Sequence, residues 1–265
     1  MNSTDMIKIV PLLGAICGDI IGSWYEFRPT KDRNFEFFRS RSQFTDDTVC
    51  SIAIADALMN DKDFIAKLQY WCRKYPRVGY GGNFNRWFRQ ENPQPYNSWG
   101  NGSAMRVSAV GAYSKSIEEV LELAKLSAEV SHNHPEGIKG AQATALAIFL
   151  AKEGKSKEEI KLEIENRFGY DLDRKYEDIQ PSYWFDVSCQ GSVPEAIIAF
   201  LESDDYESAI RMAVAYGGDA DTQAAITGGI AAAYYGEIPD FILKECLKRL
   251  PLDIKEAIAK FNQAL

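Results

Sequence analysis

The stretch Gly14-Ala-Ile-Cys-Gly-Asp-Ile-Ile-Gly-Ser-Trp-Tyr-Glu26 decides the fold that we expect for this chain. Its glycines, Gly14, Gly18 and Gly22, are spaced four residues apart, so on a helix they line one face. A glycine costs about 1 kcal/mol in a helix interior, so three of them at this spacing need a structural reason. The simplest reason is that the backbone of another helix approaches this face closely.

A second segment, Ala220–Tyr235, offers a suitable partner for that face. It consists mainly of Ala, Gly and Thr, and small side chains let two helices pack closely. We therefore expect it to pair with the glycine face of 14–22. Such a pairing would bring together two acidic segments, 44–48 and 217–222, that are far apart in the sequence.

Helical periodicity also dominates the rest of the chain. Apolar residues recur every three or four positions in 117–130, 138–149, 193–200, 210–214 and 254–261. Alternating strand patterns are rare, and no hairpin signal lies between two β-branched runs. Neither a linker nor an internal repeat interrupts the pattern. The sequence predicts an all-α protein of about a dozen helices, with residues 1–265 forming a single domain.

Three helix starts can be read from the residues. Thr45 precedes two acidic residues and an apolar run, as an N-cap does, and Pro135 follows His134 at the start of another helix. Ser192-Val-Pro-Glu195 has the pattern of a capping box, with proline early in the first turn. Residues 167–191 show the least regular pattern, and we expect them to form an excursion over the surface.

The composition excludes several classes of function. The 265 residues include 38 acidic and 30 basic residues, a net charge of -8, and only two histidines, His132 and His134. A zinc site of three histidines is therefore excluded within one chain. Carboxylates and hydroxyls favour a hard cation instead, such as Mg²⁺, Mn²⁺ or Ca²⁺. The acidic balance argues against broad binding to nucleic acid or to an anionic membrane.

The cysteines and the apolar segments indicate a cytoplasmic protein. The five cysteines are scattered and form no C-x-x-C pair, which is typical of reduced thiols. The apolar run 9–21 has some likeness to a signal peptide, but Asp19 interrupts it and no small-residue cleavage site follows. We interpret it as a buried helix. No stretch is long and apolar enough to predict a membrane span.

Two acidic segments are candidates for a metal site. In Phe44-Thr-Asp-Asp-Thr48, two hydroxyls flank two adjacent carboxylates. In Tyr216-Gly-Gly-Asp-Ala-Asp-Thr222, two carboxylates stand two residues apart after a Gly-Gly turn, a spacing that converges in a loop or cap but not along a helix face. Both segments also fit plain acidic helix caps, since a helix N-terminus favours negative charge. Mutual repulsion of the carboxylates is what a divalent ion would relieve.

Three further segments are weaker candidates. The Gly-rich loop Ser98-Trp-Gly-Asn-Gly-Ser-Ala-Met-Arg106 precedes a predicted helix, and its exposed amides would suit a phosphate, although it matches no dinucleotide or P-loop fingerprint. The segment 80–84 is similar and weaker. Each histidine of 131–135, taken alone, favours a structural role.

Taken together, these segments resemble the ADP-ribosylglycohydrolase family, which includes the dinitrogenase-reductase-activating glycohydrolases and the eukaryotic ADP-ribosylarginine and ADP-ribosylserine hydrolases. The resemblance extends from Gly14 to about Pro239, and the order of the motifs makes it specific. The matching motifs are G-x-x-x-G-D-x-x-G-S-x-x-E at 14–26, F-T-D-D-T at 44–48, G-N-G-S-A-M-R at 100–106, S-H-x-H-P at 131–135, S-V-P-E-A at 192–196 and G-G-D-A-D-T at 217–222.

The resemblance implies an orthogonal all-α bundle with a binuclear site for two Mg²⁺, or Mn²⁺ in some members. The implied metal ligands are Thr45, Asp46, Asp47, Asp219, Asp221 and Thr222. The implied substrate-binding residues are Trp99, Gly100, Asn101, Gly102, Ser103 and His132, with Gly102 and Ser103 at the diphosphate. For the aromatic residue that stacks on adenine, Trp99, Phe84 and Tyr216 are candidates. Glu26 resembles the carboxylate that closes or gates the site.

The chemistry that this implies is hydrolysis of the glycosidic bond of an ADP-ribosylated protein or small molecule, with release of ADP-ribose. Such cleavage passes through an oxocarbenium-like state, and two cations could orient the ribose hydroxyls and polarise a water. Either Asp47 or Glu26 would take up the proton. Alternatives are a non-catalytic, crystallin-like or ADP-ribose-binding relative, a phosphoesterase that uses the same aspartates, and a purely structural helical module. Substrate choice would lie in loops such as 28–43 and 167–191.

Overall fold

The structure is a computed structural model, and it describes residues 11–265. These residues form fifteen helices and no strand; one isolated antiparallel bridge joins Gly100 and Ser188. The helices are α1 (Pro11–Gly22), α2 (Asp46–Met59), α3 (Phe64–Lys74), α4 (Gly82–Trp87), α5 (Gly102–Met105), α6 (Ser108–Tyr113), α7 (Ile117–Glu129), α8 (Pro135–Lys152), α9 (Lys157–Phe168), α10 (Tyr176–Ile179), α11 (Cys189–Leu201), α12 (Tyr206–Ala215), α13 (Ala220–Tyr235), α14 (Asp240–Arg249) and α15 (Leu252–Ala264). The predicted all-α fold is confirmed.

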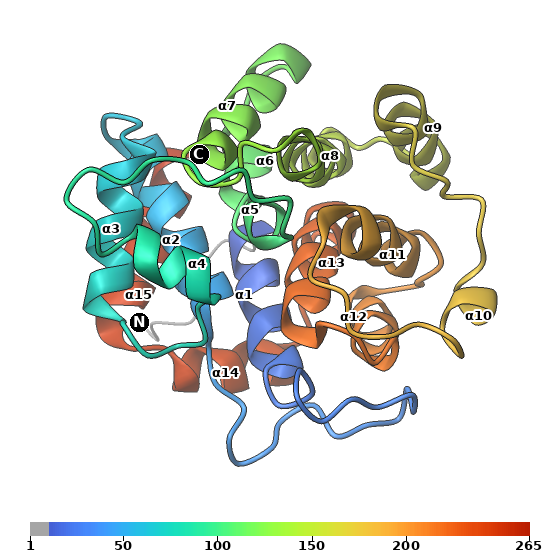
Figure 1. Cartoon of the computed structure of the whole chain (residues 1–265). Coiled ribbons are helices and arrows are strands. Elements are labelled where there is room, and N and C mark those ends of the chain that lie inside the picture. Colours follow the sequence, from blue (N-terminus) through green and yellow to red (C-terminus); the bar gives the residue numbers. More distant parts are fainter. Residues whose placement is uncertain (1–10) are drawn as a thin grey trace.

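The central feature is the pair α1 and α13, which lie side by side in the middle of the molecule (Figure 1). A Cβ placed on Gly14 would lie 2.4 Å from the carbonyl oxygen of Gly228, and one on Gly18 would lie 2.0 Å from that of Ala224. A Cβ on Gly22 would meet the carbonyl oxygen of Ala220 at 2.4 Å. The predicted pairing of the glycine face with this helix is therefore confirmed, and the order of the contacts makes the pair antiparallel.

This antiparallel arrangement positions the site. Because the C-terminal end of α1 meets the N-terminal end of α13, the segment that follows Gly22 passes beside Asp221. Helix α2 also packs against α1, so its N-terminus approaches the same end of the pair. Three chain segments that are distant in sequence thus converge at one point.

The remaining helices surround this pair. Helices α2, α3 and α15 pack together on one side, α11 and α12 contact α13 on the other, and α6, α7 and α8 form a further group (Figure 1). One hydrophobic core extends from Leu12 to Phe261 through all these groups. A single domain over residues 1–265 stays a prediction, since residues 1–10 of that range, and with them Ile9 and Val10 of the apolar run, lie outside the described residues.

Two of the three predicted helix starts are confirmed. Thr45 caps α2 by accepting a hydrogen bond from the Asp47 amide at 3.3 Å, and His134 caps α8. The capping box at Ser192 is wrong, because the N-cap of α11 is Ser188, four residues earlier, and the helix encloses Pro194. The Ser192 hydroxyl instead donates to the backbone oxygen of Asp186, a contact between segments that the local pattern could not reveal.

Residues 167–191 are largely the predicted excursion. Between the end of α9 and the start of α11, the only helix in the described structure is the single turn α10, which lies at the edge of the molecule in Figure 1. Lys31 ties this segment to the loop after α1. Its ammonium donates to the backbone oxygens of Gln180, Tyr183 and Tyr216, at 2.6, 2.8 and 2.6 Å.

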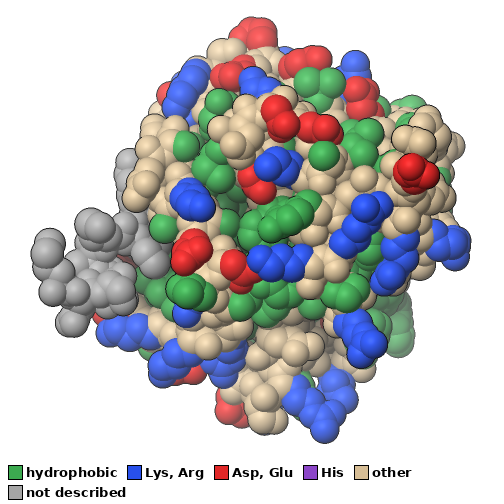
Figure 2. Space-filling view, turned by 90° about the vertical axis from the view of Figure 1, so that its left-hand side faces the viewer, with side chains coloured by type: hydrophobic (Ala, Val, Ile, Leu, Met, Phe, Trp, Pro, Cys, Tyr) green, Lys and Arg blue, Asp and Glu red, His purple; other side chains and the backbone are tan. Residues whose placement is uncertain are grey.

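The surface carries charges of both signs. On the face shown in Figure 2, basic and acidic side chains are interspersed with hydrophobic ones. All five cysteines are buried and free of disulfide bonds. Among residues 11–265, no helix has the length and apolar character needed to cross a membrane.

Candidate functional site

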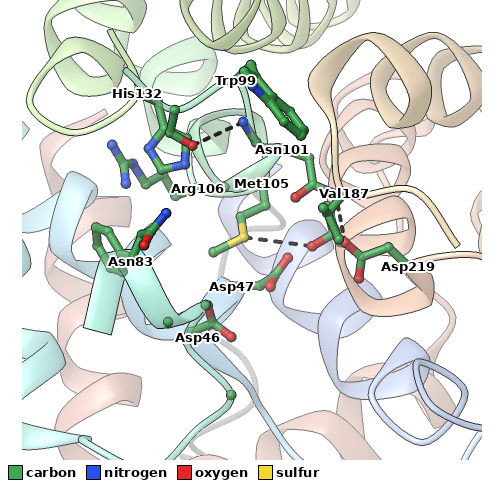
Figure 3. A pocket seen from close by; sticks show the side chains of 18 of the residues that line it. Asp46, Asp47, Asn83, Trp99, Asn101, Met105, Arg106, His132, Val187 and Asp219 are labelled. Carbon is green, nitrogen blue, oxygen red and sulfur yellow. Dashed lines mark hydrogen bonds between the residues drawn. The ribbon is translucent and has the colours of Figure 1, made fainter. Parts of the chain in front are cut away.

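A pocket of about 530 Å³ opens where α1, α2 and α13 converge. Figure 3 shows Asp46 and Asp47 on one side of Met105, with Arg106 and His132 on the other side. The pocket is lined by Glu26, Asp46, Asp47, Gly79, Gly81, Gly82, Asn83, Phe84, Tyr96, Asn97, Ser98, Trp99, Gly100, Asn101, Gly102, Met105, Arg106, His132, Phe185, Val187, Asp219, Asp221 and Thr222. It thus collects residues from nearly every motif that the sequence singled out.

The carboxylates form two overlapping groups that share Asp221. Asp19, Asp47 and Asp221 each place a carboxylate oxygen within 4.8 Å of the others, and Glu26, Asp219 and Asp221 do the same. The two acidic segments of the sequence therefore meet, as the helix pairing predicted. We call Glu26, Asp46, Asp47, Asp219 and Asp221 the carboxylate end of the pocket.

Asp19 has an orienting position within this cluster, which the sequence analysis missed. Its carboxylate is fully buried and accepts hydrogen bonds from the amide and hydroxyl of Thr45, at 2.9 and 2.7 Å. It also accepts from the amide and hydroxyl of Thr48. Asp19 therefore fixes the N-terminus of α2 from the face of α1. A single acid inside an otherwise apolar helix, next to Gly18, was the signal that could have found it.

The electrostatics of this end are unfavourable for bare carboxylates. Burial raises the pKa of Asp47 and Asp221 well above the usual value, and the neighbouring acids raise it further. Burial likewise raises the pKa of Asp219 to about 6. Burial and the charge of Asp221 raise the pKa of Glu26 to about 8. Each negative charge at this end is destabilised by the loss of its hydration and by repulsion from the neighbouring carboxylates.

The donor set fits a hard cation. Asp47 is 3% exposed, and its Oδ1 is buried without a hydrogen-bond partner among the described residues. An unpaired buried carboxylate oxygen is costly, and a divalent ion would both pair it and neutralise its neighbours. Carboxylate and hydroxyl oxygens are the ligands that Mg²⁺ and Mn²⁺ prefer. Thr222 lines the pocket, whereas the Thr45 hydroxyl is engaged by Asp19.

Asn101 connects the Gly-rich loop to the carboxylate end. Its side-chain amide donates to Asp219 at 2.7 Å and to the Ser192 hydroxyl at 3.1 Å. It therefore orients Asp219, which the sequence did not predict, while it also lines the pocket. Its predicted contact with substrate stays a prediction.

The rest of the Gly-rich loop is held against the segment before α11. The amide of Asn101 donates to the backbone oxygen of Val187 at 2.8 Å, and that of Cys189 donates to Trp99 at 2.9 Å. Trp99, Gly100 and Gly102 line the pocket, and their contact with substrate stays a prediction. Ser103 does not line the pocket: it is fully buried, and its hydroxyl donates to the backbone oxygen of Gly137 at 2.7 Å.

Aromatic residues line the wall near His132, and the structure separates the candidates for stacking. Trp99 is 47% exposed and lines the pocket, as does Phe84. Tyr216 does not, because it is fully buried against Tyr176 and Tyr183. The sequence analysis also missed a group of lining residues, Tyr96, Arg106, Phe185 and Val187. Of these four, Arg106 alone lies in one of the quoted motifs, G-N-G-S-A-M-R at 100–106, and that motif gave it no role.

Comparisons with known proteins agree with this geometry. The sequence profile of the ADP-ribosylglycohydrolase family matches residues 11–265. The chain is 27% identical to ADP-ribosylhydrolase ARH3 of Homo sapiens over 89% of its own length and 87% of that protein. It is 26% identical to ADP-ribosylarginine hydrolase Tri1 of Pseudomonas putida (strain GB-1), over 85% of this chain and 69% of that protein.

A solved structure supports the same grouping over the complete fold. A chain of an "ADP-ribosylglycohydrolase-related protein complex" superposes with a TM-score of 0.75 at 26% identity, covering 100% of this chain and 99% of that one. The motifs, the helix arrangement and the family profile therefore coincide along the chain. This protein belongs to the ADP-ribosylglycohydrolase family.

Proposed function

We propose that this protein is a metal-dependent hydrolase that cleaves the glycosidic bond of an ADP-ribosylated protein or small molecule and releases ADP-ribose. The observation that carries the proposal is the pair of carboxylate groups sharing Asp221, with the unpaired oxygen of Asp47, at one end of a 530 Å³ pocket. A pocket of that volume lies within the range that small-molecule ligands occupy. Family membership and the names of its relatives support the same class of substrate.

In this proposal, two cations are held by Thr45, Asp46, Asp47, Asp219, Asp221 and Thr222, with Mg²⁺ or Mn²⁺ as the ion. When bound, they would supply charge neutralisation, orientation of ribose hydroxyls and a more acidic water. Two overlapping carboxylate groups that share one residue support a binuclear site. Asp19 would keep the N-terminus of α2 in place through its bonds to Thr45 and Thr48.

For the proton transfer, Asp47 and Glu26 are the two candidates, and the geometry supports Glu26. Glu26 is half-buried at the pocket, on the segment after α1, so its carboxylate is within reach of solvent and ligand. Asp47 is almost fully buried and belongs to the other carboxylate group, with Asp19 and Asp221, so it is better placed to hold a cation. A carboxylate with a raised pKa is suited to exchange a proton near neutral pH.

The glycine loop and the aromatic wall would bind the nucleotide part of the substrate. Gly100 and Gly102 leave room for a ligand to approach the loop backbone, and Trp99 and Phe84 offer faces for a base. We further propose that Phe185, which lines the pocket, and Phe27, which stacks on it, contact the group that leaves. Phe27 and Phe185 stack on each other with ring centroids 6.4 Å apart.

A product assay tests this function. The protein would be incubated with ADP-ribosyl-arginine, ADP-ribosyl-serine and O-acetyl-ADP-ribose, each with Mg²⁺, Mn²⁺ or EDTA, and the released nucleotide identified by mass. We expect ADP-ribose with either metal and none with EDTA. Release of AMP would assign a phosphoesterase, and saturable binding without turnover would assign a non-catalytic binder.

A further inference from the structure

Three buried side chains form a hydrogen-bonded chain away from the carboxylate end. Arg106 Nη2 lies 3.0 Å from Ser131 Oγ, and Ser131 Oγ lies 2.8 Å from His132 Nδ1. The same Nη2 also donates to the backbone oxygen of Ser127 at 2.7 Å. Arg106 is 1% exposed, Ser131 is fully buried and His132 is 5% exposed. We call these three residues the relay.

The donor inventory fixes the direction of the relay. An arginine side chain only donates, so Ser131 Oγ accepts from Arg106. The single hydroxyl proton of Ser131 then remains for His132, which makes His132 Nδ1 the acceptor. The reverse arrangement, with Nδ1–H donating to Ser131, would leave that hydroxyl proton without an acceptor in a fully buried place, which is costly.

The surroundings of His132 also favour its neutral form. Its ring contacts those of Phe84 and Tyr96, with centroids 6.4 and 5.9 Å away. Arg106 is its charged neighbour, and the titratable side chains that act most strongly on Arg106 are Cys50 and Tyr96, not a carboxylate. Burial, and then the charge of Arg106, lower the pKa of His132 well below its usual value.

The other ring nitrogen of His132, Nε2, faces the Gly-rich loop 98–106. A Cβ placed on Gly102 would lie 3.0 Å from His132 Nε2, and one on Gly100 would lie 3.6 Å from it. Both glycines line the pocket, and Nε2 has no hydrogen-bond partner among the described residues. With Nδ1 as the acceptor of a neutral imidazole, the proton is on Nε2 and is directed to this part of the pocket.

We propose that Arg106 and Ser131 are positioning residues that hold His132 as a neutral imidazole donating from Nε2. This part of the pocket then selects a ligand that presents a hydrogen-bond acceptor, an oxygen atom, beside Gly102, and disfavours one that presents an amino group there. The proposal deepens the function proposed above and rests on it only for the identity of the ligand. The state of the ring itself is independent of any activity.

Nuclear magnetic resonance of the full chain, labelled with ¹⁵N-histidine, tests the ring directly. With two histidines in the chain, His132→Gln assigns the signals by subtraction. We expect His132 Nδ1 at the shift of an unprotonated nitrogen and Nε2 at that of a protonated one, unchanged between about pH 5.5 and 8.5. An Nδ1–H tautomer or an imidazolium at neutral pH in the unsubstituted protein would overturn the proposal.

Removing the middle hydroxyl tests the positioning role. In Ser131→Ala the Nδ1 signal should shift toward a mixture of tautomers, and calorimetric binding of ADP-ribose should weaken about fivefold to tenfold. The matched control is Ser127→Ala, equally buried in α7, whose hydroxyl donates to Ala124 and does not touch the relay. The control should keep both readouts. Equal effects of the two variants would reduce Ser131 to a structural residue and overturn the proposal.

Arg106→Lys keeps a buried positive charge but cannot make the same paired contacts. It should give the Ser131→Ala spectrum, and an unchanged tautomer would remove Arg106 from the relay and overturn its assigned role. The outcomes also separate the two proposals. If the unsubstituted protein has the expected spectrum but neither binds ADP-ribose nor releases it, the relay stands and the proposed function fails.

Discussion

The two ends of the pocket differ in how their buried polar groups are paired. At the carboxylate end, Asp47 and Asp221 lie buried with other acids as neighbours. In the relay of Arg106, Ser131 and His132, the Ser131 hydroxyl forms a hydrogen bond with His132 Nδ1. The first arrangement leaves a buried oxygen unpaired and raises the pKa of several carboxylates. The second pairs the Ser131 hydroxyl with both Arg106 Nη2 and His132 Nδ1, and leaves His132 Nε2 and Arg106 Nε without a partner among the described residues.

The difference indicates what each part needs from outside. Repulsion among carboxylates is relieved by a bound cation or by uptake of protons, so we expect a divalent ion to stabilise this end of the pocket. The relay has no such repulsion; what it lacks is an acceptor for His132 Nε2, which faces the pocket, and one for Arg106 Nε, which is buried. Substitutions that remove a charge at the carboxylate end and substitutions that remove a hydrogen bond in the relay should therefore change the free energy of unfolding in opposite directions.

The largest expected effect is on activity at the carboxylate end. Asp46→Asn and Asp219→Asn each remove a charge that would hold a cation, and we expect each to lower kcat/KM at least about a thousandfold, or ~4 kcal/mol. Circular dichroism should show an unchanged helical fold. Asp178→Asn, at an exposed position of α10, is the matched control. Full activity in either variant would reject the metal assignment.

The next effect concerns the helix pair that builds this end. In Gly18→Ala the new Cβ would lie 2.0 Å from the carbonyl oxygen of Ala224, which is backbone and has no room to yield. We expect the free energy of unfolding to fall by about 3 kcal/mol, and the Tm by about 6–12 °C. Gly82→Ala, where a Cβ meets nothing within 4 Å, should leave the Tm nearly unchanged.

If Gly18→Ala and Gly82→Ala had the same Tm, the close approach of α1 and α13 would not be what holds the carboxylates together. The relay provides a further comparison. Arg106 lies between α5 and α6, and Ser131 and His132 follow α7, so none of the three is on the helix pair. The signals of His132 should therefore change little in a Gly18→Ala protein that still folds.

The helix pairing could be predicted from the sequence because a physical cost marked it. Gly14, Gly18 and Gly22 weaken a helix unless a backbone lies against them, and the small residues of 220–235 supplied the partner. The meeting of the two acidic segments followed from that pairing. The N-cap at Thr45 was equally readable, because capping depends on neighbours in the sequence.

The missed features depend on contacts between distant segments. Ser103 was predicted to line the pocket, but its hydroxyl donates to the backbone oxygen of Gly137. Ser192 was predicted to cap a helix, but its hydroxyl donates to the backbone oxygen of Asp186. Asp19 looked like an interruption of an apolar run and is bonded to Thr45. The direction in which a small polar side chain points is set by tertiary packing, which no local pattern records.

A smaller effect, of opposite sign, should appear when one repelling charge is removed. In EDTA, Asp47→Asn should raise the free energy of unfolding by about 1 kcal/mol and the Tm by about 2–4 °C, since fewer buried charges face one another. Mg²⁺ should then raise the Tm less than it does in the unsubstituted protein. Ser131→Ala should instead lower the Tm. A lower Tm for Asp47→Asn in EDTA would show that the Asp47 carboxylate stabilises the fold without a divalent ion.

The smallest effect is expected at Lys31, which joins the loop after α1 to the segment before α11 and to the C-terminal end of α12. Its ammonium donates to Gln180, Tyr183 and Tyr216, and Gly217, with φ of +69°, leaves space for the lysine chain and Thr30. Lys31→Met keeps the length of the chain and removes the three bonds. We expect a stability change below about 1 kcal/mol, because the side chain is largely exposed.

The consequence should instead appear in positioning. Without those bonds, the loop 27–36 and the segment 180–187 should exchange amide hydrogens faster, and kcat/KM should fall about threefold to tenfold because Glu26 is held less firmly. Arg41→Met, at an exposed cation outside the loop 27–36 but in the same connection between α1 and α2, is the matched control. If both variants exchange like the unsubstituted protein, the loop is held by its own packing, such as Tyr25 against Phe35, and the carboxylate end needs no anchor beyond the helix pair.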